Sequence, residues 1–184
     1  MSAFLEKSYN EVQDNIKFSE AKNAALITLN SALITLGSGA MLNSEVSLFY
    51  RTVISIFVLL LVVPLICSIF SFRASTGSEG KMLECFYRFL DSKNQIPEAP
   101  KKYLYYAFIH KYFNDNPVKY LEEVSPGEYI DEKSLSYQMA RQIVDFSEVA
   151  WRKFILFNIA IKIEITIFFG CSIVVLAILI TKCF

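Results

Sequence analysis

The stretch VSLFYRTVISIFVLLLVVPLICSIFSF, residues 46–72, decides the fold class of this chain. Its centre, Phe57–Val63, is entirely apolar, and Arg51 near one end is its only charged residue. A helix rises about 1.5 Å per residue, so this stretch can cross a hydrocarbon core of about 30 Å. Pro64 lies within it and can kink the helix. The stretch therefore predicts a transmembrane helix over 46–72.

Two further apolar stretches flank this one along the chain. Residues 23–42 form the weaker stretch, because Thr28, Asn30, Ser31 and Thr35 interrupt it, and residues 163–181 form the other. The whole chain of 184 residues is 54% hydrophobic and only 20% charged, with a mean hydropathy of +0.38. These values indicate a membrane protein and exclude a disulfide-rich secreted scaffold and most soluble enzymes. Because 18 basic residues balance 18 acidic ones, no DNA binding is expected.

The polar block between the second and third spans predicts a small helical module. Apolar residues recur at helical spacing over 78–93, and a tyrosine-rich helix is expected over 101–114. Asn116-Pro117 begins a short helix, PVKYLEEV, and Ser125-Pro126-Gly127 ends it. No helix breaker follows from about Asp131 to Gly170, which predicts one long helix that enters the third span. The predicted fold is an all-α membrane protein organised as an N-terminal amphipathic helix with a transmembrane hairpin (1–72), a cytoplasmic module (73–150), and the end of the long helix with the third span (151–184).

Basic residues predict the orientation of these spans. The block 73–153 carries twelve Lys and Arg residues and residues 1–22 carry three, whereas the link 43–45 carries none. Since Lys and Arg concentrate on the cytoplasmic side, the N-terminus and the block 73–153 are expected in the cytoplasm. Three crossings then place the C-terminus on the outer side of the membrane.

The first span carries two neighbouring helical stripes. Small residues dominate one stripe, and the other is half polar, with Glu20, Asn23, Ile27 and Asn30. Small residues let transmembrane helices approach closely, and polar groups at membrane depth face other helices or a water path. Packing within one protomer and a face between subunits or along a pore both explain these stripes. The small-residue stripe is Lys17, Ala21, Ala24, Thr28, Ser31 and Thr35.

Two charged residues lie at the start of the third span. Lys162 is expected to snorkel to the interface, whereas Glu164 shares a face with Ile161 and Phe168. An acid on an apolar face predicts contact with a partner helix, and Lys22 or Lys17 lies at the matching depth. The candidate polar or oligomer face is therefore Glu20, Lys22, Asn23, Thr28, Asn30, Ser31, Lys162 and Glu164.

Cations mix with aromatic residues in the polar block, over a segment with net positive charge. Such a mixture can stack a base and neutralise its phosphate, although it also suits a membrane-interface belt. Both interpretations remain open. The candidate ligand-binding residues are Arg88, Lys101, Lys102, Tyr105 and Lys111.

Catalytic and metal-binding patterns are not found in the sequence. No nucleophile has a base near it in sequence, no glycine-rich phosphate loop occurs, and His110 is the only histidine. We expect neither an enzyme nor a bound metal.

Three segments resemble a known family, the transmembrane effectors of Pycsar and related cyclic-nucleotide (CBASS-like) anti-phage systems. IKFSEAKNAALITLNSALI (16–34) is similar to the opening motif F-[AS]-[DE]-x-K-[AN] of that family. YFNDNPVKYLEEV (112–124) and QIVDFSEVAWRKFILFNIAI (142–161) resemble its cytoplasmic segment and its last helix, where Lys153 precedes the apolar run. The residues that match the opening motif are Phe18, Ser19, Glu20, Lys22 and Asn23.

The resemblance implies a homo-oligomeric effector that disrupts the membrane and causes abortive infection. A cyclic nucleotide would be its ligand, bound by the helical block because the sequence has no separate cyclic-nucleotide fold, or an upstream sensor protein would relay the signal. Membrane lipid is the other expected partner, and no resident cofactor is expected. The residues alone also allow a constitutive scaffolding membrane protein or a small channel subunit without a nucleotide ligand.

Overall fold

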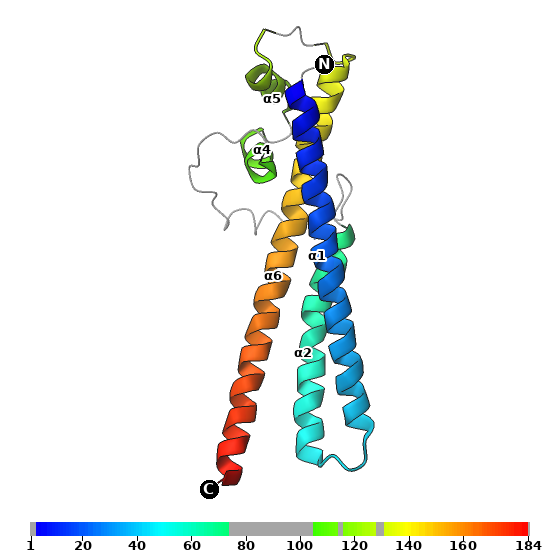
Figure 1. The fold of residues 1–184 in the computed structure, drawn as a ribbon, viewed down its shortest axis with the longest axis vertical. Coiled ribbons are helices and arrows are strands. Elements are labelled where there is room, and N and C mark those ends of the chain that lie inside the picture. The colour runs from blue at the N-terminus through cyan, green and yellow to red at the C-terminus, as the bar shows by residue number, and fades with distance from the viewer. Residues whose placement is uncertain (1–2, 74–104, 114–115, 128–130, 184) are drawn as a thin grey trace. The chain divides into compact units, whose positions relative to one another are not determined.

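A computed structural model describes residues 3–73, 105–113, 116–127 and 131–183 (Figure 1). Every regular element in these ranges is a helix, which confirms the all-α prediction. The helix predicted over 78–93 lies outside the described residues, and so do the candidate ligand residues Arg88, Lys101 and Lys102.

Three of the helices are long and apolar enough to cross a membrane, as predicted. They are α1 (Ala3–Leu42), α2 (Leu48–Arg73) and α6 (Leu135–Cys183). Since no breaker interrupts residues 131–169, α6 runs without a break from the polar block into the third apolar stretch. The α1–α2 link is short, and the Arg51 guanidinium donates a 2.7 Å hydrogen bond to the carbonyl of Asn43 just after α1 ends.

Two short helices follow the polar segment that begins the block. Helix α5 (Pro117–Val124) has the predicted bounds, because the side chain of Asn116 accepts a hydrogen bond from the backbone of Lys119 and Pro117 occupies the first turn. Helix α4 (Tyr106–Phe113) is shorter than the predicted 101–114, and residues 101–104 lie outside the described ranges.

The chain divides into two compact units. The first unit comprises Met1–Glu20 and Arg73–Ile155, and its apolar core joins α1, α4, α5 and α6. Phe113 and Tyr120 are the largest fully buried side chains of this core, and their rings meet edge to face at 5.0 Å. Buried apolar residues of this core include Leu5, Val12, Ile109, Leu121, Ile143 and Val144.

The second unit comprises Ala21–Phe72 and Leu156–Phe184, and it contains most of the apolar length of the three long helices. Its large apolar side chains are mostly exposed, as expected of surfaces that lipid covers: Leu36, Leu59 and Phe169 are each about 70% exposed. Helices α1 and α2 approach closely at Gly37, where an added Cβ would lie 2.5 Å from Cγ2 of Val58. A small residue at this position lets the two backbones pack together.

Candidate functional site

The two stripes of α1 lie in different surroundings. All six members of the small-residue stripe, from Lys17 to Thr35, are exposed. Thr28 and Thr35 donate their hydroxyls to the carbonyls of Ala24 and Ser31, at 2.9 and 2.8 Å, so these hydroxyls are satisfied within their own helix. The small-residue stripe is therefore an outward face that needs no polar partner.

The half-polar stripe turns toward the other helices of its unit. Asn23 and Asn30 are 1% and 0% exposed. The Asn23 amide donates a 2.8 Å hydrogen bond to the hydroxyl of Ser71 on α2. Packing within one protomer therefore accounts for the burial of these two asparagines.

Glu164 is 5% exposed and contacts α1, the helix that the sequence predicts. The predicted lysine partners are wrong. The amide of Asn30 donates to Oε2 of Glu164 across 3.5 Å, whereas Lys22 lies over the ring of Phe157 and the exposed Lys17 pairs with Asp14. The register of α1 against α6 explains the difference, because it brings residue 30 rather than residue 22 to the level of Glu164.

Glu20 forms an ion pair with Lys153, which the sequence reasoning did not predict. Nζ of Lys153 lies 2.7 Å from Oε1 of Glu20, and the lysine side chain is 4% exposed against 43% for the glutamate. Aromatic rings lie beside the pair, since Phe18 and Tyr106 both contact Phe154. Both charges belong to the segments quoted for the family resemblance, but neither segment identifies the other as its partner.

The remaining members of the candidate face are exposed. Ser31 and Lys162 both lie at the surface of the second unit. Lys162 therefore has the exposure that snorkelling requires. On α6, Glu148 and Arg152 form an ion pair one turn apart.

Only two of the candidate ligand residues lie in the described ranges. Tyr105 precedes α4, is 45% exposed, and has its ring 4.9 Å from that of Tyr106. Lys111 is exposed on α4. The ligand site therefore stays a prediction.

Two tyrosine hydroxyls of the first unit, those of Tyr106 and Tyr120, have a raised pKa. Burial raises the pKa of Tyr120 to about 12, although its 2.7 Å hydrogen bond with the Ser8 hydroxyl lowers it in part. Burial also raises the pKa of Tyr106, and the neighbouring Tyr105 raises it further. Both hydroxyls can therefore act as neutral hydrogen-bonding groups at physiological pH.

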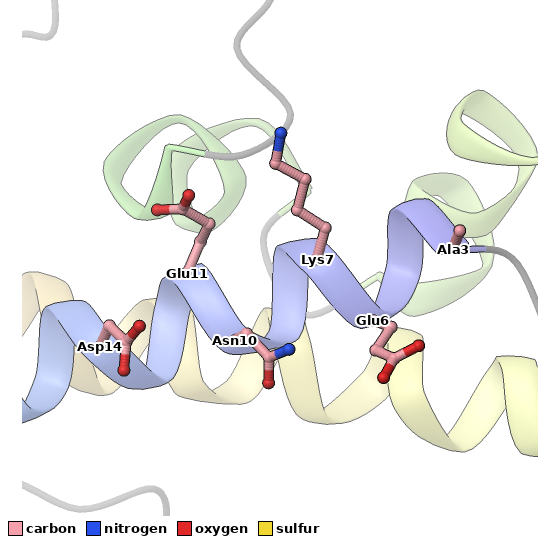
Figure 2. Close-up of a pocket in the computed structure, with 6 residues that line it drawn as sticks. All are labelled: Ala3, Glu6, Lys7, Asn10, Glu11 and Asp14. Atoms are coloured by element: carbon pink, nitrogen blue, oxygen red, sulfur yellow. The ribbon is translucent and has the colours of Figure 1, made fainter.

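A hollow of about 310 Å³ lies along exposed residues at the start of α1. Figure 2 shows that its lining residues all project from this one helix. Three of them are acidic and one is basic, so the hollow repels phosphate and does not suit a nucleotide. The lining residues are Ala3, Glu6, Lys7, Asn10, Glu11 and Asp14.

A larger groove of about 970 Å³ lies between α2 and α6 in the second unit. Its lining is almost entirely apolar, and Phe57 and Phe168 meet edge to face at 5.9 Å beside it. A groove of this kind suits lipid chains or an apolar helix rather than a polar ligand. Most of its lining comes from Val53, Ile54, Phe57, Leu60, Ile167, Phe168, Val174 and Val175.

Comparison with known proteins gives one match. The family model described as the Pycsar effector protein domain, PycTM, matches residues 4–182, which include almost the whole chain. No curated protein and no solved structure matches.

Proposed function

Because the chain belongs to the Pycsar effector protein domain family, it is an anti-phage membrane effector, and we propose that a cyclic-nucleotide signal makes it disrupt the membrane and stop the growth of the infected cell. The observation that carries this proposal is the extent of the match, since residues 4–182 take in all three membrane-length helices together with the polar block. The chain acts without catalysis in this proposal. Its location is the bacterial inner membrane, with the N-terminus and residues 73–153 in the cytoplasm.

The continuity of two helices supports a coupling between signal and membrane. Helices α1 and α6 each contribute residues to both units. The ion pair of Glu20 with Lys153 joins these same two helices within the first unit. A signal that repositions the first unit would therefore move the helices that continue into the second, provided that it binds one arrangement better than the other.

The ligand of the proposed signal is a cyclic nucleotide bound by the helical block. Arg88, Lys101, Lys102, Tyr105 and Lys111 supply the cations and aromatic rings that such a ligand needs. Calorimetric titration of the detergent-solubilised chain with a panel of cyclic nucleotides tests this. Heat from at least one nucleotide supports direct binding, and a flat response across the panel contradicts it in favour of relay by an upstream sensor protein.

Association of several copies would complete the mechanism. The exposed small-residue stripe permits close approach of another helix, and the apolar groove between α2 and α6 can accept one. We expect Thr28→Leu, on the stripe, to reduce the oligomer measured by mass photometry. Thr52→Leu is the matched control, because Thr52 is also exposed and bonded to its own helix, at 3.0 Å, but lies on α2 away from the groove lining. Equal oligomer in both variants would contradict this interface.

Entry of a membrane-impermeant dye tests the proposed activity. Bacteria that express the chain are infected with phage, and propidium uptake is followed by flow cytometry beside cells with an empty vector. We expect uptake in the expressing cells before phage are released. Expressing cells that stay sealed under every trigger would instead favour the constitutive scaffold.

A further inference from the structure

Each membrane-length helix places a buried oxygen without a hydrogen-bond partner in the second unit. These atoms are Oδ1 of Asn30 on α1, Oγ of Ser68 on α2 and Oε1 of Glu164 on α6. The three residues are 0%, 0% and 5% exposed. Unsatisfied polar groups at membrane depth are costly, so this set, which we call the polar seam, is an exception that needs a reason.

The contacts of Asn30 fix how its amide is oriented. Its nitrogen donates to the carbonyl of Leu26 at 3.1 Å and to Oε2 of Glu164 at 3.5 Å. A flipped amide would set its oxygen against the Leu26 carbonyl, so the assigned orientation is the favourable one. The oxygen of Asn30 therefore stays an unused acceptor, and so does the second oxygen of Glu164.

Ser68 belongs to the same region of the second unit. It precedes Ser71 by three residues on α2, and Ser71 accepts from Asn23 of the antiparallel α1. Because the two helices are antiparallel, Ser68 lies about one turn from Ser71 in the direction in which α1 runs from Asn23 to Asn30. The polar seam thus continues the contact between Asn23 and Ser71 toward the contact between Asn30 and Glu164.

The chemistry of these atoms decides what they can receive. A carboxylate oxygen and an amide oxygen only accept, and a hydroxyl can accept as well. In the described part of the chain, no basic side chain forms an ion pair with Glu164. Whatever enters the seam must therefore bring positive charge or hydrogen-bond donors, which favours water and cations and disfavours anions.

A site with one carboxylate and two neutral oxygens suits a monovalent cation that passes through, rather than a divalent cation that is held tightly. Among the described residues no group of three or more His, Cys, Asp or Glu side chains gathers to hold a metal ion, and tight calcium sites need six to eight oxygens, several of them from carboxylates. Carboxylates beside a permeation route are the usual source of selectivity for cations.

We propose that the polar seam of Asn30, Ser68 and Glu164 is hydrated when the second unit opens, and that the carboxylate of Glu164 makes the resulting leak selective for K⁺ and Na⁺ over Cl⁻. This inference rests on the proposed membrane-disrupting function. It adds the class of ion that crosses and the residue that selects it. Water that enters the seam can donate hydrogen bonds to its three buried oxygens, so we expect water and cations to enter there first.

Reversal potentials across planar bilayers test the inference. The full-length chain is inserted in phosphatidylethanolamine and phosphatidylglycerol with a KCl gradient and the four 3′,5′-cyclic nucleoside monophosphates in the bath. We expect wild-type protein to conduct K⁺ at least about fivefold better than Cl⁻, and Glu164→Gln to bring the ratio close to one. Glu164→Asp keeps the charge and should keep most of the selectivity.

Lys162→Gln is the matched control, because it neutralises an exposed charge two residues away and should not lower the ratio. Thermal unfolding in detergent first shows that each variant has the same transition temperature as the wild-type protein. A leak with equal K⁺ and Cl⁻ permeability, or an unchanged ratio in Glu164→Gln, overturns the inference and leaves the proposed function standing. Wild-type protein that conducts with none of the four nucleotides overturns the direct-binding form of the proposed function, and the inference with it.

Discussion

The two units differ in how they treat buried polar groups. In the first unit, each buried polar side chain named here meets a partner on another helix at a short distance, with 2.7 Å between the hydroxyls of Ser8 and Tyr120 and 2.7 Å between buried Lys153 and half-buried Glu20. In the second, Asn23 and Ser71 also meet at 2.8 Å, but the closest approach between Asn30 and Glu164 is 3.5 Å and both of these residues keep an unused oxygen. The difference indicates that the first unit is held in one arrangement, whereas the second has more to gain from the entry of water.

The largest expected effect comes from Glu20→Ala. This change removes the carboxylate that lies against the almost fully buried ammonium of Lys153. Breaking a buried ion pair from one side costs about 3 kcal/mol when one partner is partly solvated. The fluorescence of Trp151, the only tryptophan, can follow thermal unfolding in detergent. The exposed pair of Lys17 and Asp14 supplies the control, and Asp14→Asn should change stability little. Equal effects of the two changes would show that the pair of Glu20 and Lys153 does not hold the first unit in one arrangement.

The next effect concerns Tyr120 and alkaline pH. Burial raises its pKa from 10.0 in the unfolded reference to about 12 in the folded chain. A raised folded pKa means that the stabilisation is fully present below pH 10 and is lost as the pH rises toward 12, by about 3 kcal/mol over this range.

Melting temperatures between pH 9 and pH 12 test this expectation. Tyr120→Phe should be less stable at neutral pH by about 1 kcal/mol, because the hydrogen bond with Ser8 is lost, but its stability should fall less steeply above pH 10. Parallel pH profiles for the two proteins would contradict the closed environment of this tyrosine in the first unit.

A smaller effect of opposite sign is expected in the second unit. Replacing both members of a poorly satisfied buried pair by apolar residues is often stabilising, so Asn30→Leu combined with Glu164→Leu should raise stability by about 1–2 kcal/mol. The same double variant should leak less dye than wild type, because the polar seam can no longer hydrate. A lower stability of the double variant would show that the polar seam stabilises the fold, as the pairs Ser8–Tyr120 and Glu20–Lys153 do in the first unit.

Sequence reasoning predicted the elements well because their signals are local. Apolar length specifies the three membrane-length helices, the absence of breakers specifies the long helix α6, and Asn116-Pro117 specifies where α5 begins. The first residues of the tyrosine-rich helix predicted over 101–114, residues 101–104, lie outside the described ranges, and α4 begins at Tyr106.

Contacts between helices were harder to predict because the register of one helix against another is set by packing. Glu20 and Lys153 are 133 residues apart, and nothing local in either segment identifies the other. The expectation that Glu164 meets α1 followed from its charge on an apolar face, but the choice between Asn30 and Lys22 depended on a shift of about two turns. The two stripes of α1 have the same helical spacing, so only the structure shows that the asparagines face inward and the small residues outward.

The smallest expected effect comes from Gly37→Ala, where α1 and α2 of the second unit pack closely. Gly37→Ala places a Cβ 2.5 Å from Cγ2 of Val58, and because valine is stiff at its first torsion the helices must shift, at a cost of about 1 kcal/mol. Gly39→Ala is the matched control two residues away, where an added Cβ meets nothing within 4 Å. Thermal unfolding of the two variants in detergent separates them, and we expect only Gly37→Ala to lower the transition. If both are neutral, α1 and α2 do not pack tightly at Gly37, and the leak would not be confined to the polar seam.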